Sequence, residues 1–289
     1  MQGRLYIVDV TNRDGVQGAR MILPKLAKTI VNLYLDEFGV FQSEVGFPTL
    51  RHEVNYIKAN LHLQRLGAIK DMRLGGWCRA IPSDVRLVFE NCSELRHLSL
   101  SASLSDLMIE GKFGRRRQWQ DILNSMCESV RLAKNLGADT VVINAEDASR
   151  TETQRLIDFA NAGVEAGADR IRYCDTVGIE NPISITNKIQ TILEAIQTPI
   201  EIHCHNDIGM ALANSLTAAV SIVKAGVDCY INTTISGYGE RAGNCDLFTT
   251  ALALSYSQGL SETLRPARPL NLTLSWSCLL YTSPSPRDS

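Results

Sequence analysis

The strongest constraint on the fold of this chain is an alternation of short strand-like segments with longer helix-like segments, repeated eight times. The strand candidates are short apolar runs, and they cover residues 5–11, 40–47, 72–80, 97–103, 139–145, 170–175, 200–205 and 229–235. The helical candidates are amphipathic, and they cover residues 23–38, 51–67, 82–91, 118–136, 151–166, 184–196, 210–226 and 245–258. Eight such units in about 250 residues match the size of a TIM barrel. The sequence therefore predicts an α/β fold, a (β/α)8 TIM barrel, over residues 1–260.

A doubly wound open sheet uses the same units, but it more often carries a Gly-rich phosphate loop after its first strand. No such loop follows residues 5–11. The 29 basic and 31 acidic residues are mixed along the chain, with a net charge of -2. This balance gives no electrostatic footprint for nucleic acid or an acidic membrane, which favours a small-molecule partner. The eight cysteines form no CxxC pair, and neither a signal peptide nor an apolar run of membrane-spanning length is present, so we predict a cytoplasmic protein.

The end of the chain differs in character from the rest. Residues 278–289, "CLLYTSPSPRDS", resemble the translation of a sequencing-library adapter, and we exclude them from the fold as one excludes a fusion scar. Their apolar surface is small against an ordering entropy of about 1 to 2 kcal/mol per residue. We therefore expect Leu279 and Leu280 to make few contacts with the barrel. Residues 261–277 would be the start of a truncated C-terminal segment.

Polar side chains collect after the predicted strands, at the end of the barrel where TIM-barrel enzymes carry their active sites. They are Arg13, Asp14, Glu44, Ser103, Asn144, Glu146, Asp175, Thr176, His203, His205 and the loop of residues 237–244. Because they come from most of the eight units, their shared position indicates a site more strongly than any single motif does.

Two histidines lie two residues apart in the seventh predicted strand. Side chains alternate across a strand, so His203 and His205 point to the same face. Two such imidazoles can bind a divalent cation, and Asp14 and Asn244 lie in loops that could supply a third and a fourth ligand. Two nitrogens and two oxygens do not select among zinc, magnesium and manganese. An isolated pair of strand histidines is more often structural, and the two loop residues shift the balance toward a metal site.

Six motifs in order resemble the acyl-CoA condensing synthases of the DRE-TIM metallolyase superfamily, which include homocitrate, 2-isopropylmalate, citramalate and Re-citrate synthases. They are "VDVTNRDGVQ", "SEVGFP", "AEDASRTE", "CDTVG", "HCHNDIGMALANS" and "GYGERAGN". The resemblance covers nearly all of residues 4–258 and is more specific for the superfamily than for the substrate. It implies a metal-dependent condensation of acetyl-CoA with a 2-oxo acid, followed by thioester hydrolysis.

The resemblance also implies roles for individual residues. Asp14, His203 and His205 would be metal ligands, with Asn244 as a weaker one. Arg13 would be catalytic and stabilise the charge that develops on the keto oxygen, as a guanidinium beside a Lewis acid can.

Further substrate contacts follow from the same resemblance. Thr176 would bind the carboxylate of the oxo acid, and His97 would lie near the acceptor side chain. Glu146, the second expected catalytic residue, would lie next to the thioester, and Asn144 stands where relatives often have Ser. Glu44, at the end of the second strand, completes the expected substrate-binding set.

The acceptor acid and the direction of the reaction stay open at this stage. "RIRYCDTVG" favours a dicarboxylate, 2-oxoglutarate before oxaloacetate, with 2-isopropylmalate synthase as an alternative. A 3-hydroxy-3-methylglutaryl-CoA-type lyase would carry a Cys before Asn244, whereas Cys245 follows it. An inactive binding fragment is the third possibility, because the C-terminal segment of these synthases supplies a His and a Tyr, often from the partner of a homodimer, and no His follows His205. The arginines of residues 115–117 could meet coenzyme A phosphates, although a solvated face is the commoner role. Asn12 and Val16, which depart from the usual motif, put the shape of the acceptor pocket in question.

Overall fold

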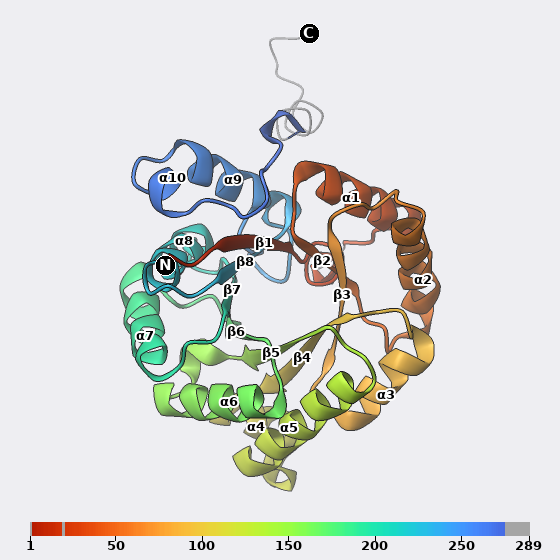
Figure 1. The fold of residues 1–289 in the computed structure, drawn as a ribbon. Coiled ribbons are helices and arrows are strands. Elements are labelled where there is room, and N and C mark those ends of the chain that lie inside the picture. Colours follow the sequence, from red (N-terminus) through yellow and green to blue (C-terminus); the bar gives the residue numbers. More distant parts are fainter. Residues whose placement is uncertain (1, 19–20, 275–289) are drawn as a thin grey trace.

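The computed structural model describes residues 2–18 and 21–274, and its core is a closed parallel barrel in the order β1-β2-β3-β4-β5-β6-β7-β8 (Figure 1). The strands are β1 Leu5–Asp9, β2 Gln42–Gly46, β3 Arg73–Arg79, β4 His97–Ser103, β5 Thr140–Glu146, β6 Arg170–Asp175, β7 Ile200–Cys204 and β8 Cys229–Thr233. β1 pairs with both β2 and β8, which closes the ring. The predicted (β/α)8 TIM barrel is confirmed.

Helices surround the barrel on its outside (Figure 1). They are α1 Lys25–Phe38, α2 Arg51–Arg65, α3 Pro82–Asn91, α4 Asp106–Phe113, α5 Trp119–Asn135, α6 Thr153–Ala166, α7 Pro182–Ala195, α8 Ala211–Lys224, α9 Leu247–Tyr256 and α10 Leu260–Thr263, with 3-10 turns η1 Gly15–Gln17, η2 Gly114–Arg116, η3 Ala148–Arg150 and η4 Ile235–Gly237. The sequence did not predict α4, which follows β4 and leads through η2 into α5.

The layer between strands and helices is apolar and tightly packed. Phe38 of α1 and Phe248 of α9 meet edge to face with their ring centroids 5.8 Å apart. Gly163 of α6 lies so close to β5 that a Cβ there would stand 2.1 Å from Cδ1 of Ile143, so a larger residue at this position would force the Ile143 side chain to move. Apolar burial, worth about 25 cal/mol per Å², is the main interaction between this layer of helices and the strands, and hydrogen bonds such as that from Ser43 of β2 to Asn32 of α1 add to it.

The interior of the barrel, by contrast, is charged. Arg172 is among the largest fully buried side chains of the described residues, and it forms ion pairs with Glu44 and Glu201. Layers of branched apolar residues are the usual filling of a TIM barrel. Charge inside this barrel therefore needs an explanation beyond packing.

Aromatic rings fill the barrel at the N-terminal ends of its strands. Tyr6 and Tyr230 stack with centroids 4.6 Å apart, and Phe41 lies 4.7 Å from Tyr6. The guanidinium of Arg170 lies 4.1 Å from the centre of the Tyr230 ring, a distance at which a cation is attracted to the ring face. This end is occupied by side chains.

The segment after α10 returns along the barrel. Pro266 forms a β-bridge with Leu5, and the amide of Asn271 donates to the carbonyl of Phe38 at 2.8 Å. Residues 264–274 thus pack beside α1. The expectation for residues 278–289 falls outside the described residues.

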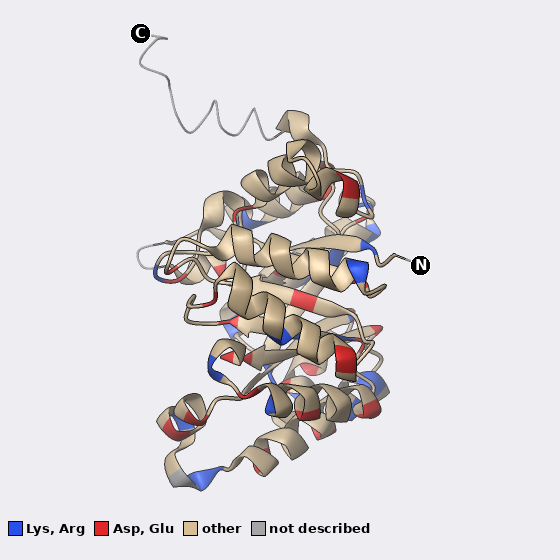
Figure 2. Ribbon diagram, turned by 90° about the vertical axis from the view of Figure 1, so that its left-hand side faces the viewer, with Lys and Arg blue, Asp and Glu red and all other residues tan. Residues whose placement is uncertain are grey.

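The ribbon in Figure 2 shows basic and acidic positions interspersed along the chain on the side in view. Within the described residues, no helix is both long enough and apolar enough to cross a membrane.

Candidate metal and substrate site

The C-terminal ends of the strands surround a cavity of about 170 Å³. Its lining is Arg13, Asp14, Gln17, Phe47, Trp77, Ser101, Asn144, Glu146, Arg172, Cys174, Thr176, His203, His205 and Glu240. The sequence placed a site at this end of the barrel, and the cavity lies there.

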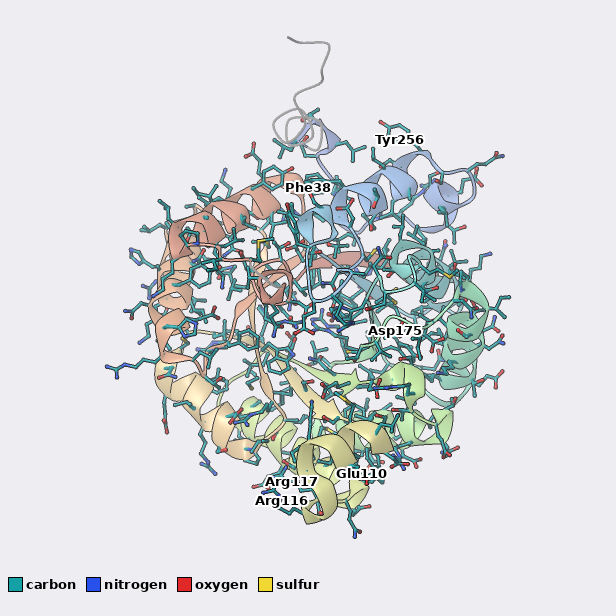
Figure 3. The ribbon with its side chains drawn as sticks, turned by 180° about the vertical axis from the view of Figure 1, so that it is seen from behind. Phe38, Glu110, Arg116, Arg117, Asp175 and Tyr256 are labelled. Carbon is teal, nitrogen blue, oxygen red and sulfur yellow. The ribbon has the colours of Figure 1, made fainter. Side chains whose placement is uncertain are left out.

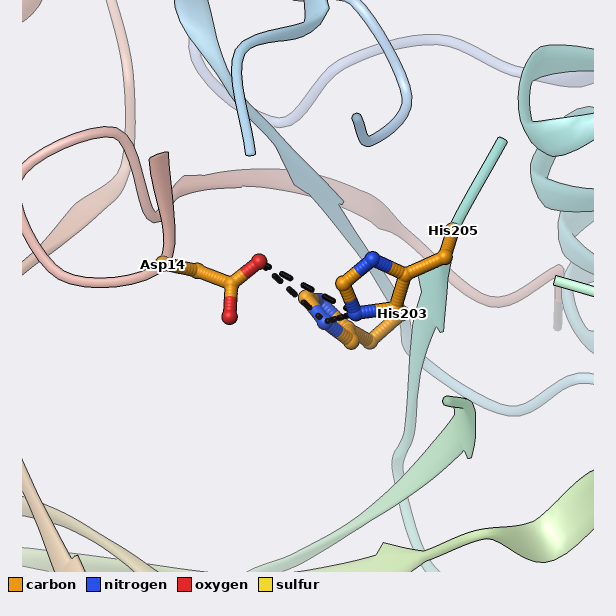
Figure 4. Close-up of side chains that lie close together, drawn as sticks. All are labelled: Asp14, His203 and His205. Atoms are coloured by element: carbon orange, nitrogen blue, oxygen red, sulfur yellow. Dashed lines mark hydrogen bonds and ion pairs between the residues drawn. The ribbon is translucent and has the colours of Figure 1, made fainter. Parts of the chain in front are cut away.

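Asp14, His203 and His205 converge at the wall of this cavity (Figure 4). The two Nε2 atoms are 3.2 Å apart, and Oδ2 of Asp14 lies 3.8 Å from Nε2 of His203 and 3.9 Å from Nε2 of His205. All three residues are buried. They are the only His, Cys, Asp and Glu group of this kind found in the described part of the chain.

Local structure fixes these three side chains. Strand β7 turns His203 inward, and His205 continues the alternation just beyond the strand, where it bridges to Asn244. Asp14 lies in the tight turn after β1, where its amide donates to the carbonyl of Val10 at 2.8 Å. The ligand atoms therefore come from two segments that the barrel brings together, the end of β7 and the turn after β1.

The cluster fits a divalent cation. Four ligands at about 2.0 to 2.2 Å in a tetrahedron lie about 3.4 Å from one another, close to the distances within the cluster. Burial lowers the pKa of His203 to about 3 and also lowers the pKa of His205, so both imidazoles are neutral near pH 7 and have lone pairs to offer. Burial alone would raise the pKa of Asp14, but Arg13 and the histidines outweigh it and lower that pKa to about 2.

Asn244 lies against the same cluster. Its Nδ2 donates to Oδ2 of Asp14 at 2.8 Å and to the carbonyl of Tyr238 at 3.0 Å. Its Oδ1 is buried without a hydrogen-bond partner among the described residues, as is Nδ1 of His205. Unsatisfied buried polar atoms are rare unless a ligand or an ion completes them, which agrees with Asn244 as an outer member of a metal site.

Arg13 stands between the cluster and the barrel interior. Its Nη1 donates to Oδ1 of Asp14 at 2.6 Å, and its Nε donates to Oε2 of Glu44 at 2.9 Å. The guanidinium lies 5.7 Å from the centre of the Trp77 ring. Two carboxylates thus fix its orientation at the cavity wall.

Two expected substrate residues lie elsewhere. Glu44 is fully buried and does not line the cavity, since its carboxylate oxygens accept from Arg13 and Arg172. These two guanidinium groups outweigh burial and lower the pKa of Glu44.

His97 is the first residue of β4, at the N-terminal end of the barrel, where its Nδ1 lies 2.8 Å from Oγ1 of Thr140. A residue that begins a parallel strand lies at the end opposite the site, so the expected contact of His97 with the acceptor is wrong.

The other expected residues do line the cavity. Asn144 is buried on β5 and its Oδ1 has no partner within the described chain. The hydroxyl of Thr176 accepts from the amide of Asp147 at 2.9 Å, which leaves its proton available to a ligand. Asp175, near the middle of the barrel in Figure 3, instead accepts from the amides of Ile179 and Glu180 and holds that loop.

Glu146 lies where two cavities meet. Its carboxylate accepts from Lys112 Nζ at 2.6 and 2.7 Å and from the hydroxyl of Ser103 at 2.6 Å. Glu146, Trp77 and Ser101 also line a second cavity of about 250 Å³ with mostly apolar walls. A small polar cavity therefore adjoins a larger apolar one.

The cationic rim of the second cavity includes part of the arginine run. Arg117 lines this cavity, with its guanidinium 5.3 Å from the centre of the Phe113 ring. Arg116 is exposed, and both arginines lie at the periphery of the molecule in Figure 3. Arg79 and Lys112 are further lining residues.

Sequence reasoning missed several cavity residues and misread two others. Gln17 belongs to the quoted first motif and could have been found from it, whereas Trp77 carries no motif and was hidden inside a predicted strand. Asn12 does not line the cavity, because its Nδ2 donates to the carbonyl of Lys28 and to Oδ1 of Asn32 beneath α1. Val16 lines a different surface pocket.

The fold and this geometry define a class, a TIM-barrel protein with an Asp-His-His site suited to a divalent cation at the C-terminal mouth. The chain belongs to the HMGL-like family, whose model matches residues 4–272.

Three relatives illustrate the range of the family. The chain is 50% identical over 281 residues to a citrate (Re)-synthase of Dehalococcoides mccartyi, covering 97% of this chain and 68% of the relative. It is 42% identical to 2-isopropylmalate synthase 2 of Caldanaerobacter subterraneus, covering 87% of this chain and 62% of the relative. It is 33% identical to homocitrate synthase 1 of Nostoc sp., covering 93% of this chain and 68% of the relative. The chain therefore spans about two thirds of the length of these relatives.

Solved structures agree on the fold. An HMG-CoA lyase from Bacillus subtilis matches with a TM-score of 0.77 and 16% identity, covering 96% of this chain and 92% of that one. The carboxyl transferase domain of Rhizobium etli pyruvate carboxylase matches with a TM-score of 0.68 and 16% identity, covering 96% of this chain and 46% of that one. At these identities the likeness shows the barrel and nothing about the reaction.

Proposed function

We propose that this barrel is the catalytic domain of an acyltransferase that condenses acetyl-CoA with a 2-oxo acid and hydrolyses the resulting thioester. The observation that carries the proposal is the Asp14, His203 and His205 cluster with Arg13 beside it, in a polar cavity that opens into an apolar one. The names of the three relatives, all synthases of this kind, support it.

The polar cavity suits a 2-oxo acid. A divalent cation held by Asp14, His203 and His205 would supply Lewis acidity to the oxo group. Arg13 is positioned by Glu44 and Asp14 to stabilise negative charge that develops there, without reorganising during the reaction. Thr176 offers a hydroxyl proton to a carboxylate, and the unpartnered amide oxygen of Asn144 can accept from a ligand hydroxyl.

The apolar cavity suits the thioester arm of acetyl-CoA. It shares Glu146, Trp77 and Ser101 with the polar cavity, so a thioester in one cavity could reach an oxo group in the other. Lys112 and Ser103 hold the Glu146 carboxylate at this junction. Arg79 and Arg117 at the rim are suited to phosphates, which guanidinium groups bind in bidentate fashion.

The acceptor acid is the finer part of the proposal. We place oxaloacetate first, supported by the 50% identity to a citrate (Re)-synthase, and 2-oxoglutarate, which the motif comparison favoured, second. A homodimer and a cytoplasmic location stay predictions from the sequence.

A lyase of the same barrel is disfavoured by the position of the cysteine that follows Asn244 in the loop after β8. Cys245 follows Asn244, is buried and has its Sγ 3.2 Å from Oγ1 of Thr250. It does not line the polar cavity, so it is not placed to act on a substrate there.

Thiol release from acetyl-CoA tests the proposal. The purified chain is assayed with oxaloacetate, 2-oxoglutarate, 2-oxoisovalerate and pyruvate in parallel, before and after chelation and with Mg²⁺, Mn²⁺ or Zn²⁺ restored. We expect release with oxaloacetate above the other acids, loss on chelation and recovery with metal. Chelation-insensitive release would contradict the metal-dependent reaction, and release with 2-oxoglutarate alone would reverse the ranking of acceptors.

A further inference from the structure

Arg172 links the site to the barrel interior. Its Nη2 donates to Oε1 of Glu44 at 2.5 Å and its Nε donates to Oε1 of Glu201 at 2.8 Å. The same Glu44 holds Nε of Arg13 through its other oxygen. One carboxylate is therefore shared between a guanidinium at the cavity and a guanidinium in the core.

The pairing continues to the other end of the barrel. Oε2 of Glu201 lies 3.3 Å from Nε of Arg170, and Oε1 accepts from Nδ2 of Asn232 at 2.6 Å. Charges of alternating sign thus follow one another through the barrel in the order Asp14, Arg13, Glu44, Arg172, Glu201, Arg170. Glu201 is fully buried and is not among the residues that line the site cavity.

Such a chain of charges is expensive to bury. The desolvation penalty of a buried ion pair often equals or exceeds its Coulombic gain, and apolar residues of similar volume are frequently as stable. Apolar layers would fill this barrel adequately. The desolvation cost of these buried charges would be offset if they hold a functional group in a fixed orientation.

We propose that Glu201 is a positioning residue for Arg13, acting through Arg172 and Glu44. Glu44 is held between two cations, and Glu201 supplies the second anionic partner of Arg172. Without the charge of Glu201, Arg172 would draw Glu44 toward itself and loosen the bond from Glu44 to Nε of Arg13. The guanidinium would then lose the fixed orientation that makes it effective toward developing charge.

A double-mutant cycle tests this, and it rests on the proposed condensing activity. Turnover with acetyl-CoA and oxaloacetate is measured for the wild type, Glu201→Gln, Arg13→Lys and the double variant. Loss of an outer hydrogen-bonding partner costs about 10- to 100-fold in activity at comparable sites. We expect Glu201→Gln to lower kcat by about tenfold with KM changed much less, and to have less than about a twofold effect when Arg13 is already Lys, because residues that act as a unit are non-additive.

Glu180→Gln is the matched control. Glu180 is also buried and ion-paired, to Lys188 at 2.9 Å, but it belongs to the loop between β6 and α7 and is not a member of the series of charges that includes Arg13. Its kcat should stay within about twofold of wild type at comparable loss of stability. Equal losses of kcat in the two variants, or additive effects of Glu201→Gln and Arg13→Lys, would overturn the proposal.

A second measurement separates this proposal from the proposed function. The Nε–H resonance of Arg13 is assigned in the ¹⁵N-labelled chain by its loss in Arg13→Lys, and its hydrogen exchange is followed. We expect exchange about tenfold faster in Glu201→Gln than in wild type. Unchanged exchange would overturn the positioning role even if the wild type shows no turnover, and absent turnover with faster exchange would count against the reaction alone. If Glu201→Gln does not fold, Glu201→Asp, which keeps the charge but retracts it by one methylene, should change both readouts in the same direction by less.

Discussion

The two ends of this barrel use their ionisable groups differently. At the C-terminal end, Asp14, His203 and His205 face a cavity, and Nδ1 of His205 and Oδ1 of Asn144 and Asn244 have no hydrogen-bond partner among the described residues. At the N-terminal end, Tyr6 and Tyr230 stack on the neighbouring strands β1 and β8, and the guanidinium of Arg170 lies over the ring of Tyr230. One end keeps binding capacity and the other is filled.

This difference between the two ends shows which feature identifies a functional site in a barrel. Both ends carry histidine and arginine, so composition does not distinguish them. His97 at the filled end lies 2.8 Å from a threonine hydroxyl, whereas His205 at the open end has a buried nitrogen without a partner in the described residues. Unmet hydrogen-bonding capacity beside a cavity, rather than residue type, marks the site. Nε of Arg170 at the filled end also lacks a hydrogen-bond partner in the described part of the chain, but Arg170 does not line the site cavity.

The largest effect should come from removing the imidazoles at the open end. Replacing His203 and His205 with Ala should abolish metal binding, since one carboxylate cannot hold a divalent cation tightly. Metal analysis of the purified double variant after dialysis checks this, with His62→Ala as a control at an exposed histidine. An unchanged amount of metal per chain in the double variant would contradict a metal site at these residues.

The next largest effect is expected from Arg13, whose guanidinium lies beside the Asp14, His203 and His205 cluster. Arg13→Lys should lower kcat by about 100-fold while oxo-acid affinity falls much less, because an ammonium cannot reproduce two directed bonds to Asp14 and Glu44. Steady-state kinetics and calorimetric binding of the oxo acid together separate the two quantities. Equal losses in both would mean that Arg13 binds the ground state and the transition state alike.

At the N-terminal end of the barrel, the same comparison predicts that a substitution lowers stability without lowering metal binding. Tyr230→Ala removes the ring that contacts Tyr6, Phe41 and Arg170, and it should lower the free energy of unfolding by about 3 kcal/mol. Urea denaturation measures that change, and metal analysis should show unchanged stoichiometry. Loss of the metal in folded Tyr230→Ala would show that the two ends are not separable.

A smaller, pH-dependent effect is expected at Asp9, which ends β1 and is fully buried. Burial raises its pKa to about 7, against the opposing bond from the amide of Thr11. The folded state therefore holds this proton more tightly than the unfolded state, and stability should fall as the pH rises from about 4 through 7. Between pH 5 and 8 the wild type should lose on the order of 2 kcal/mol relative to Asp9→Asn, measured by urea denaturation. Parallel pH profiles would argue against a protonated Asp9.

The smallest effect is predicted for His97→Asn. Burial lowers the pKa of His97 to about 4, so the residue is neutral near pH 7 and its loss removes one hydrogen bond to Thr140, worth about 1 kcal/mol. Turnover and KM for the oxo acid should stay within about twofold of wild type. A larger change in KM would show that His97 contacts the acceptor acid, contrary to its position in the structure.

Much of this protein is determined by local sequence. The eightfold alternation of periods two and 3.6 fixed the barrel, because each unit must bury one apolar face against its neighbours. The spacing of His203 and His205 placed two imidazoles on one face, since alternation along a strand needs no tertiary information. The same rule shows why His97 was misplaced: its position as the first residue of β4 already put it at the far end of the barrel.

Only the tertiary structure decided the charged interior and the shape of the site. Glu44 and Arg172 are 128 residues apart and meet inside the barrel, and no local pattern encodes that pair. From the sequence Glu44 was expected at the end of its strand, as a substrate-binding residue would be, but it is the middle residue of β2, and its oxygens accept from two arginines of other elements. The depth of a side chain and the identity of its partners depend on which strands close the ring and in what register. Local periodicity therefore located the site, and long-range contacts determined which of its residues remain free to meet a ligand.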